Sequence, residues 1–403
     1  MRGSNAAAAL LFRRKGDGST LNLDFTTGAL DSRVVLTRSA NTATYINSSG
    51  YVTTAVANEA RFDYDPTTLA AKGLLIEGSA INLLKYSVYA DTNWITAGGY
   101  TKSYTTGITS PANDSAAVKI TFSAVGHGLY TNNSQMSYTN TVSSVYTWSA
   151  WIRATANTTN LNIRFGDSAV GLGSNIPIST TWTRYSYSYT AVSSSGPHLN
   201  SASGTATGEF EMWGFQLEIG SAASSYIPTT TAQVTRNPDL ALMTSTNFSS
   251  WFTGGTTGTF FVDWHGGVRG ITSTVRSVIS TSDQTTKHLH LQQASAAGVL
   301  KVADFSAAHS VSTSNSITSG ARTKGAFNFD GATTTVNLCL NGSTVATSTA
   351  IAFSVAPTWL VLGGTSTDGS TLTDLTTVLN GSIRQIKYYP TALTSAQLIA
   401  LTT

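Results

Sequence analysis

The sequence is poor in the residues that carry most protein chemistry, and each shortage excludes a class of protein. Cys339 is the single cysteine among 403 residues, so a disulfide within the chain and a zinc site built from several cysteines are excluded. No apolar run approaches the roughly 18 residues of a membrane-spanning helix, which argues against membrane insertion. Charged residues make up 11% of the chain, against roughly 25% in an average soluble protein.

The small excess of positive charge is confined to the N-terminus. The net charge of +3 equals the balance of Arg2, Arg13, Arg14 and Lys15 against Asp17, so the rest of the chain is formally neutral. No clustered basic face remains, and we expect no nucleic-acid partner. The basic run either contacts an acidic partner or is a solvated terminus. It follows a short apolar stretch, the reverse of a secretory signal, so we expect a protein that such a signal does not export.

Most of the chain consists of short strand-like segments separated by turn residues, the pattern of an all-β fold. Residues 88–236 predict one β-sandwich of jelly-roll type. Alternation in VYTWSAWIR places Trp148 on one strand face and Trp151 on the other. After Asn237-Pro238 a second series predicts another sandwich over residues 237–403, with a hairpin at Asn341-Gly342.

The two ends of the chain differ from this pattern. Residues 1–87 have too few apolar residues for a core of their own, so we expect an extended arm that docks on its own chain or on other chains. At the opposite end, Thr394 can cap a short helix that buries Leu398 and Leu401. The predicted fold is therefore all-β, an N-terminal extended arm followed by two β-sandwich domains.

Acidic pairs that could catalyse hydrolysis are scarce. The chain has five glutamates, and Glu209 and Glu211 share a strand face in GEFEMW. A glycoside hydrolase needs two carboxylates about the sugar bond, so this pair is the candidate for catalysis. Because the two acids alternate with Phe210 and Met212, a solvent-facing side of a strand explains them more simply. We expect a protein that is not an enzyme.

Metal and cofactor sites have equally weak support. His288 and His290 share a strand face, but no nearby acidic or cysteine ligand completes a metal set. Asp368 and Asp374 lie in one loop and could hold calcium, although a turn-forming aspartate explains Asp368 as well. Neither a nucleophile elbow nor a phosphate-binding glycine loop occurs. We expect no cofactor.

Aromatic side chains are the remaining candidates for binding, because sugar rings present apolar C–H faces that stack on them. Trp151 opposes the Trp148 face, and Tyr185, Tyr187 and Tyr189 share one face of TRYSYSYT. These four are the candidate carbohydrate contacts. A second packed layer or a subunit contact would explain them equally well.

Three ordered motifs resemble a segment of tailed-bacteriophage structural proteins. They are RFDYDP at residues 61–66, GLLIE at 73–77 and NLL at 82–84. Residues 37–50 are similar to the segment that precedes these motifs, and residues 213–236 resemble the closing strand of a carbohydrate-binding-module-like jelly roll. VNLCLNGSTV and the chain from residue 381 to 398 are similar to a concanavalin-like or laminin-G-like sandwich.

The resemblance implies a virion protein, either a capsid fibre or decoration or a tail-fibre component. It would be assembled in the host cytoplasm, act as a homotrimer with other virion proteins as partners, and bind host-surface polysaccharide weakly. Arg13, Arg14 and Lys15 then become candidates for attachment to the virion. Two alternatives stay open: a tail depolymerase that uses Glu209 or Glu211, and a purely structural decoration without a ligand.

Overall fold

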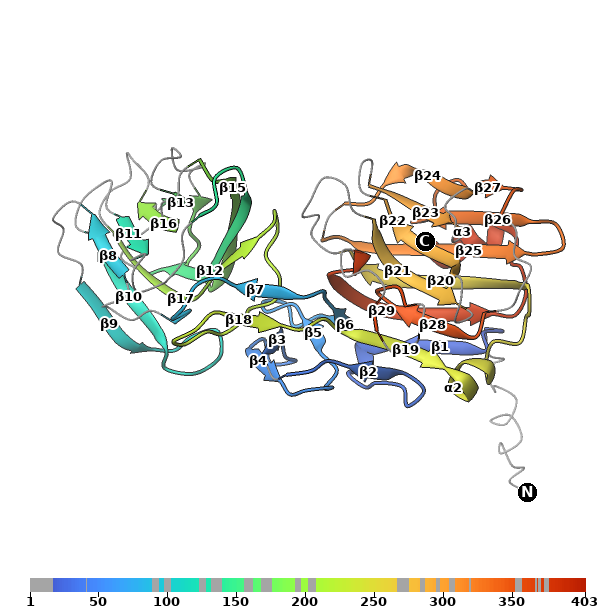
Figure 1. Cartoon of the computed structure of the whole chain (residues 1–403), viewed down its shortest axis with the longest axis horizontal. Coiled ribbons are helices and arrows are strands. Elements are labelled where there is room, and N and C mark those ends of the chain that lie inside the picture. Colours follow the sequence, from blue (N-terminus) through green and yellow to red (C-terminus); the bar gives the residue numbers. More distant parts are fainter. Residues whose placement is uncertain are drawn as a thin grey trace, which may run out of the picture.

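The computed structural model describes most of the chain as antiparallel strands. The described residues are 17–40, 42–88, 94–97, 103–122, 128–131, 140–155, 162–167, 176–192, 197–201, 208–266, 275–282, 287–294, 298–303, 309–318, 320–351, 357–366, 368, 371–372 and 377–403. The predicted all-β class is confirmed, and Figure 1 shows two lobes side by side, each built of strands.

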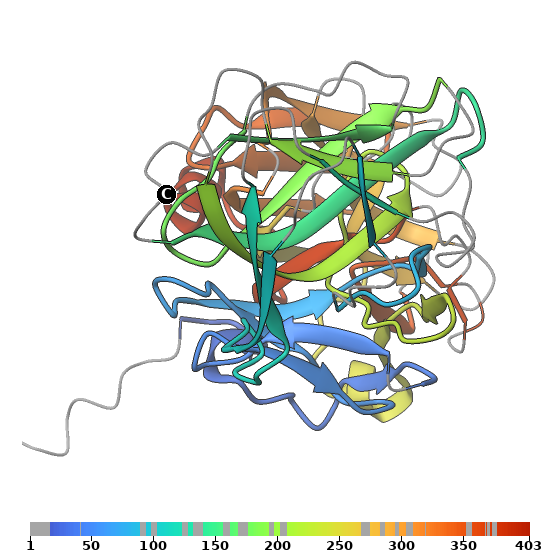
Figure 2. The same ribbon diagram turned by 90° about the vertical axis from the view of Figure 1, so that its left-hand side faces the viewer.

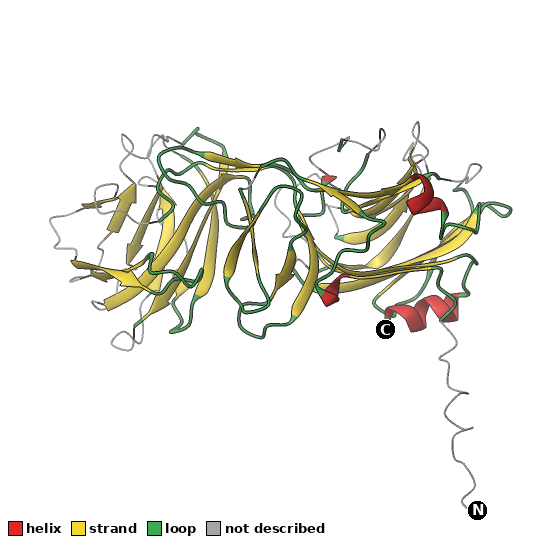
Figure 3. Ribbon diagram, turned by 90° about the horizontal axis from the view of Figure 1, so that it is seen from below, coloured by secondary structure: helices red, strands yellow, loops and turns green. Residues whose placement is uncertain are grey.

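The larger lobe is a sandwich of two sheets, seen as two layers in Figure 3. In spatial order the first sheet contains β27 (Ala346–Ser348), β26 (Thr335–Leu340), β25 (Arg322–Asp330), β20 (Thr257–His265), β29 (Gly381–Tyr389), β6 (Ala71–Ile76) and β5 (Phe62–Tyr64), with β1 (Leu21–Asp24) also beside β29. The second contains β2 (Val35–Thr37), β19 (Leu240–Thr244), β28 (Trp359–Leu362), β21 (Arg276–Ser282), β22 (Lys287–Gln293), β23 (Val299–Ala303) and β24 (Ser310–Ser316). Side chains such as Trp264, Phe327 and Leu360 fill the space between them.

The N-terminal segment belongs to this larger sandwich. One edge of β29 is shared by two N-terminal strands, because β6 pairs with residues 381–383 and β1 with residues 385–388. Strand β2 pairs with β19 in the opposite sheet. Leu21, Leu23 and Ile76 are buried in the common core. Of the two expected docking partners, the chain itself or other chains, the first is found: the strands of residues 21–24 and 71–76 pair with the chain's own C-terminal strand and bury their apolar side chains there.

The smaller lobe is the predicted jelly roll. Its first sheet contains β15 (Thr183–Thr190), β12 (Val145–Ala154), β17 (Gly208–Ile219), β10 (Ala117–Phe122) and β9 (Ser103–Ile108). Its second contains β14 (Ile176–Pro177), β13 (Asn162–Asp167), β16 (Pro197–Ser201), β11 (Gly128–Thr131) and β8 (Trp94–Ala97). Trp148, Ile152 and Phe210 lie in its core.

The jelly roll is an insertion into the larger sandwich. The chain enters it after β7 (Ala80–Asn82) and leaves it before β18 (Val234–Arg236), and these two strands pair with each other as a neck (Figure 1). The expected order of arm, first sandwich and second sandwich is therefore corrected: the second domain is discontinuous, formed by the segments on both sides of the jelly roll. Pairing between strands more than 150 residues apart leaves no local pattern in the sequence.

A hairpin of β3 (Ala43–Ile46) and β4 (Val52–Ala55) bridges the lobes and lies beside the jelly roll in Figure 2. Val52 packs in one cluster with Trp151, Trp213 and Tyr226 of the jelly roll. This hairpin is therefore a second layer on the outer face of β12.

Helical structure is sparse among the described residues. It consists of η1 (Phe25–Thr27), α2 (Ser245–Ser249) and α3 (Ser395–Thr402). The predicted cap is confirmed, since Thr394 and Gln397 form a reciprocal capping box; Leu398 is buried and Leu401 partly buried against the same cluster. Asn341 and Gly342 form the turn between β26 and β27, both with positive φ, as predicted. No helix in the described part is long and apolar enough to span a membrane.

Candidate functional site

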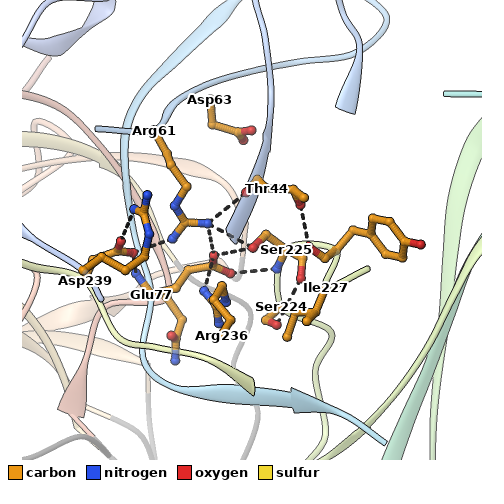
Figure 4. A network of polar contacts seen from close by, with 12 residues as sticks. Thr44, Arg61, Asp63, Glu77, Ser224, Ser225, Ile227, Arg236 and Asp239 are labelled. Carbon is orange, nitrogen blue, oxygen red and sulfur yellow. Dashed lines mark hydrogen bonds and ion pairs between the residues drawn. The ribbon is translucent and has the colours of Figure 1, made fainter. Parts of the chain in front are cut away.

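A buried ion network stands at the root of the neck (Figure 4). Glu77, directly after β6, accepts hydrogen bonds on Oε2 from Arg61 Nη1 at 2.6 Å, Arg236 Nη1 at 2.5 Å and Ser225 Oγ at 2.6 Å. Its other oxygen, Oε1, accepts from the backbone N–H of Ser225 at 2.8 Å. Ser225 is the contribution of the inserted jelly roll, so this carboxylate joins both lobes.

Asp239 is the second anion of the network. Its Oδ1 accepts from Arg38 Nη1 at 2.8 Å, while Oδ2 accepts from Arg61 and from the backbone N–H of Glu77 at 2.9 Å. The side chains of Arg38, Arg61 and Asp239 are fully buried. Three guanidinium groups therefore face two carboxylates among almost completely buried side chains.

These contacts explain the ionisation of the network. Burial alone would raise the pKa of Glu77, but attraction to Arg236 and Arg61 and the hydrogen bonds from Ser225 outweigh it and lower the pKa to about 2. Burial would lower the pKa of Arg61, but Asp239 and Glu77 raise it above its ordinary value. Glu77 and Arg61 are therefore held in their charged forms, as expected of a structural ion pair.

The motifs that resemble phage proteins supply much of this junction. Besides Arg61 and Glu77, they contain Asn82, whose amide donates to Phe215 O at 3.0 Å and Ile227 O at 2.9 Å and whose Oδ1 accepts from two backbone N–H groups. Gly73 has a φ of 100°, and a Cβ there would lie 2.1 Å from the carbonyl oxygen of Ile383. The motifs thus join the neck to the sandwich.

The aspartates of the first motif have different roles. Asp65 accepts from the backbone N–H groups of Thr67 and Thr68, as a turn-forming aspartate does. Asp63 instead accepts from the N–H of Ile46 at 2.9 Å and fixes strand β3. It faces a cleft.

This cleft, of about 460 Å³, lies between the β3–β4 hairpin, the jelly roll and the rim of the larger sandwich. Its aromatic lining comes from Tyr45, Trp151, Trp182 and Tyr226. Its polar lining includes Asp63, Lys72, Arg184, Ser224, His265 and Asn380. Aromatic rings and hydrogen-bonding groups therefore converge on one concave site.

The aromatic wall is ordered by edge contacts and by two arginines. Trp151 meets Tyr226 nearly at right angles, with ring centroids 5.6 Å apart. The guanidinium of Arg184 lies 4.6 Å over the ring of Trp151, and that of Arg153 lies 4.7 Å over the ring of Trp182. Trp182 is only half-buried, so it presents more ring surface to a ligand than Trp151 does.

The polar wall contains groups with shifted pKa values. Burial raises the pKa of Asp63, partly opposed by Lys72, whose Nζ lies 3.8 Å from Oδ2. Burial and the nearby charge of Arg384 lower the pKa of His265, which favours the neutral ring. Arg184 donates to Ser224 O at 2.6 Å and to Ser149 Oγ at 3.0 Å.

The four predicted carbohydrate contacts do not gather in one place. Trp151 lines the cleft, but it is only 6% exposed because the β3–β4 hairpin covers its face of β12. Tyr189 is 5% exposed in the jelly-roll core, and Tyr185 and Tyr187 pack against that core from the same face. Trp151 and Tyr189 are thus poorly placed to contact a sugar, and the alternative of a second packed layer accounts for Trp151.

Both candidate catalytic acids are held in cross-strand ion pairs. Glu209 lies 3.5 Å from Lys119 Nζ on β10, and Glu211 pairs with Arg153 on β12. Each carboxylate thus faces a cation on the neighbouring strand, in line with the simpler interpretation as a polar strand face. Neither lines the cleft.

The remaining candidates either form a turn or lie outside the described residues. Among the described residues no group of three or more metal-ligating side chains occurs. Asp368 accepts from the N–H and hydroxyl of Thr371, as a turn-forming aspartate does. Asp374 and the attachment candidates Arg13, Arg14 and Lys15 lie outside the described residues.

Sequence reasoning missed most of the cleft. Trp182, Lys72 and His265 come from three distant elements, and no spacing in the sequence connects them. One feature of the sequence could have indicated the cleft. Trp182 is an aromatic residue in a polar stretch, TTWTR, directly before a predicted strand.

No protein-family model matches the sequence, and neither does any curated protein. Several solved structures are similar over part of the chain. The CBM40 domain of the Ruminococcus gnavus IT-sialidase is 21% identical, with 37% of this chain and 83% of that chain covered at a TM-score of 0.31. The SAP-like pentraxin of Limulus polyphemus is 14% identical, with 37% and 70% covered at 0.32. The CBM22-1 xylan-binding domain of Paenibacillus barcinonensis Xyn10C is 14% identical, with 37% and 99% covered at 0.28.

Proposed function

We propose that this chain is a non-enzymatic, glycan-binding protein of a bacteriophage virion and that the cleft beside the neck holds the sugar. The observation that carries the glycan part is the lining of the cleft. Trp182 and Tyr45, both half-buried, offer aromatic surface, while Ser224 and Asn380 add polar groups around it. A saccharide has the same two-sided character, with C–H faces and a rim of hydroxyl groups.

The dimensions and position of the cleft also suit a small saccharide. A volume of about 460 Å³ falls within the roughly 300–1,000 Å³ of small-molecule sites. The site lies between two lobes that a rigid ion network holds together, so its walls are formed before a ligand arrives. Such preorganisation reduces the entropy lost on binding.

The virion part of the proposal is supported by the resemblance of residues 61–84 to phage structural proteins. A homotrimer and attachment through the basic N-terminus belong to the same proposal and rest on that resemblance alone. The N-terminal strands no longer argue for a trimer, because they bury their apolar side chains in their own chain.

A glycan array probed with the wild-type chain and with Trp182→Ala tests the binding site. We expect saccharide signals from the wild type and at least about tenfold weaker binding by the variant, a difference of roughly 1.4 kcal/mol. Tyr51→Ala is the matched control, because Tyr51 is an exposed aromatic residue that does not line the cleft. Flat signals from the wild type would refute glycan binding and favour a purely structural decoration; equal binding by Trp182→Ala would place the sugar elsewhere.

A further inference from the structure

One arginine of the cleft differs from the other buried arginines at the junction. Arg38, Arg61 and Arg236 each contact a carboxylate of the network. Arg184, at the start of β15, makes no ion pair within the described residues, and its hydrogen bonds go to a carbonyl oxygen, of Ser224, and a hydroxyl oxygen, of Ser149. What sets Arg184 apart is therefore the missing carboxylate partner, which leaves its positive charge unpaired at the cleft wall.

The nearest acidic groups do not neutralise this charge by contact. Glu218 accepts from Gln216 Nε2 at 2.7 Å and from the N–H and hydroxyl of Ser224, so both of its oxygens are occupied by neutral donors. Burial raises the pKa of Glu218, opposed in part by its hydrogen bonds from Ser224 and Gln216 and by the charge of Arg184. Glu77 is held by Arg61 and Arg236, as described above.

A second cation lines the same cleft. Lys72 extends from β6, its side chain is 31% exposed, and its Nζ is 3.8 Å from Asp63, farther than a direct hydrogen bond. Asp63 accepts one hydrogen bond, on Oδ1 from the backbone N–H of Ile46. The cleft thus holds Arg184 and Lys72 against two carboxylates: Glu77 is already bound by Arg61 and Arg236, and Asp63 is only loosely paired.

We infer that the saccharide bound in this cleft is anionic and carries a carboxylate group that Arg184 and Lys72 receive. The inference rests on the proposed glycan-binding function and specifies its ligand. A guanidinium presents parallel N–H groups that match the two oxygens of a carboxylate. The ring of Trp151 supports one face of Arg184 at 4.6 Å, so the group is oriented before the ligand binds.

The test compares an acidic oligosaccharide with its own neutral derivative. The probes are the array's strongest carboxylated ligand and the same compound after reduction of its carboxyl groups to primary alcohols. Arg184→Gln is expected to weaken binding of the carboxylated probe at least about tenfold, as for loss of a charge-assisted hydrogen bond, and to change binding of the reduced probe little. Arg33→Gln is the matched control, since Arg33 pairs with Asp31 away from the cleft.

Lys72→Gln provides an independent variant, because its partly exposed side chain can be replaced without opening the buried core. It is expected to weaken the carboxylated probe and to reduce the salt dependence of its binding. Array hits confined to neutral sugars, and lost in Trp182→Ala, would overturn the acidic ligand while leaving the proposed function intact. Hits confined to phosphorylated sugars would refute the inference that the bound group is a carboxylate. An array without hits would overturn both the inference and the function beneath it.

Discussion

Replacing Glu77 by glutamine would show how strongly the ion network holds the neck. The substitution keeps the shape of the side chain but leaves Arg38, Arg61 and Arg236 facing a single carboxylate, Asp239. Glu77 Oε2 accepts three hydrogen bonds and Oε1 a fourth. Whichever way the new amide is turned, its NH2 group must face at least one existing donor.

The expected loss of folding stability follows from this hydrogen-bond geometry. Removing one member of a buried, hydrogen-bonded ion pair costs about 3–5 kcal/mol, a large part of the roughly 5–15 kcal/mol that stabilises a typical domain. We expect Glu77→Gln to lower the free energy of unfolding by that amount in urea titrations followed by tryptophan fluorescence. The cluster of Trp151, Trp213 and Tyr226 near the junction makes this signal sensitive to loosening of the lobes.

The matched control is Glu211→Gln, which removes a carboxylate from a partly exposed pair with Arg153. Exposed pairs contribute about 1 kcal/mol or less. If Glu77→Gln costs no more than Glu211→Gln, the network does not hold the neck and the structural interpretation of the motifs fails.

Three further results are expected. The pKa of Glu77 is about 2 in the folded chain, against an ordinary value of 4.5. The charge of Glu77 therefore stabilises the fold above about pH 4.5, and this contribution is lost as the pH falls toward 2. Over this pH range the urea midpoint of Glu77→Gln should fall less steeply than that of the wild type. Gly73→Ala should lower the free energy of unfolding by at least about 3 kcal/mol in the same titrations, because the new methyl group would meet the carbonyl oxygen of Ile383. The control is Gly107→Ala, which also has a positive φ but nothing within 4 Å of the new methyl group, and it should cost only about 1 kcal/mol. Equal costs for the two variants would show that the backbone angle alone matters. Replacing residues 84–232 by a short turn should leave the larger sandwich folded by circular dichroism and amide NMR dispersion, and an unfolded product would contradict the insertion.

The fold class could be predicted from the sequence because it depends on local patterns of a few neighbouring residues. Alternation in β12, the turn at Asn341-Gly342 and the cap at Thr394 each depend on a few neighbouring residues. The insertion of the jelly roll could not be predicted, because the partners of β1 and β7 and one of the two partners of β6 lie more than 150 residues away along the chain.

The site was harder to predict for a related reason. Alternation assigns Trp151 and Trp148 to opposite faces, but it does not reveal that a hairpin from residues 43–55 covers the outer face. The cleft exists only where that hairpin, the jelly roll and the larger sandwich meet. The role of Arg184 and Lys72 cannot be predicted from the sequence for the same reason. Their charges indicate a binding site only once the positions of the nearby carboxylates are known.

A crystal structure of the wild-type chain with its best saccharide ligand bound would test the account most directly. We predict the sugar in the cleft beside Trp182, with its carboxylate within hydrogen-bond distance of Arg184. A sugar bound at another surface, with the cleft unchanged, would contradict the proposed binding site.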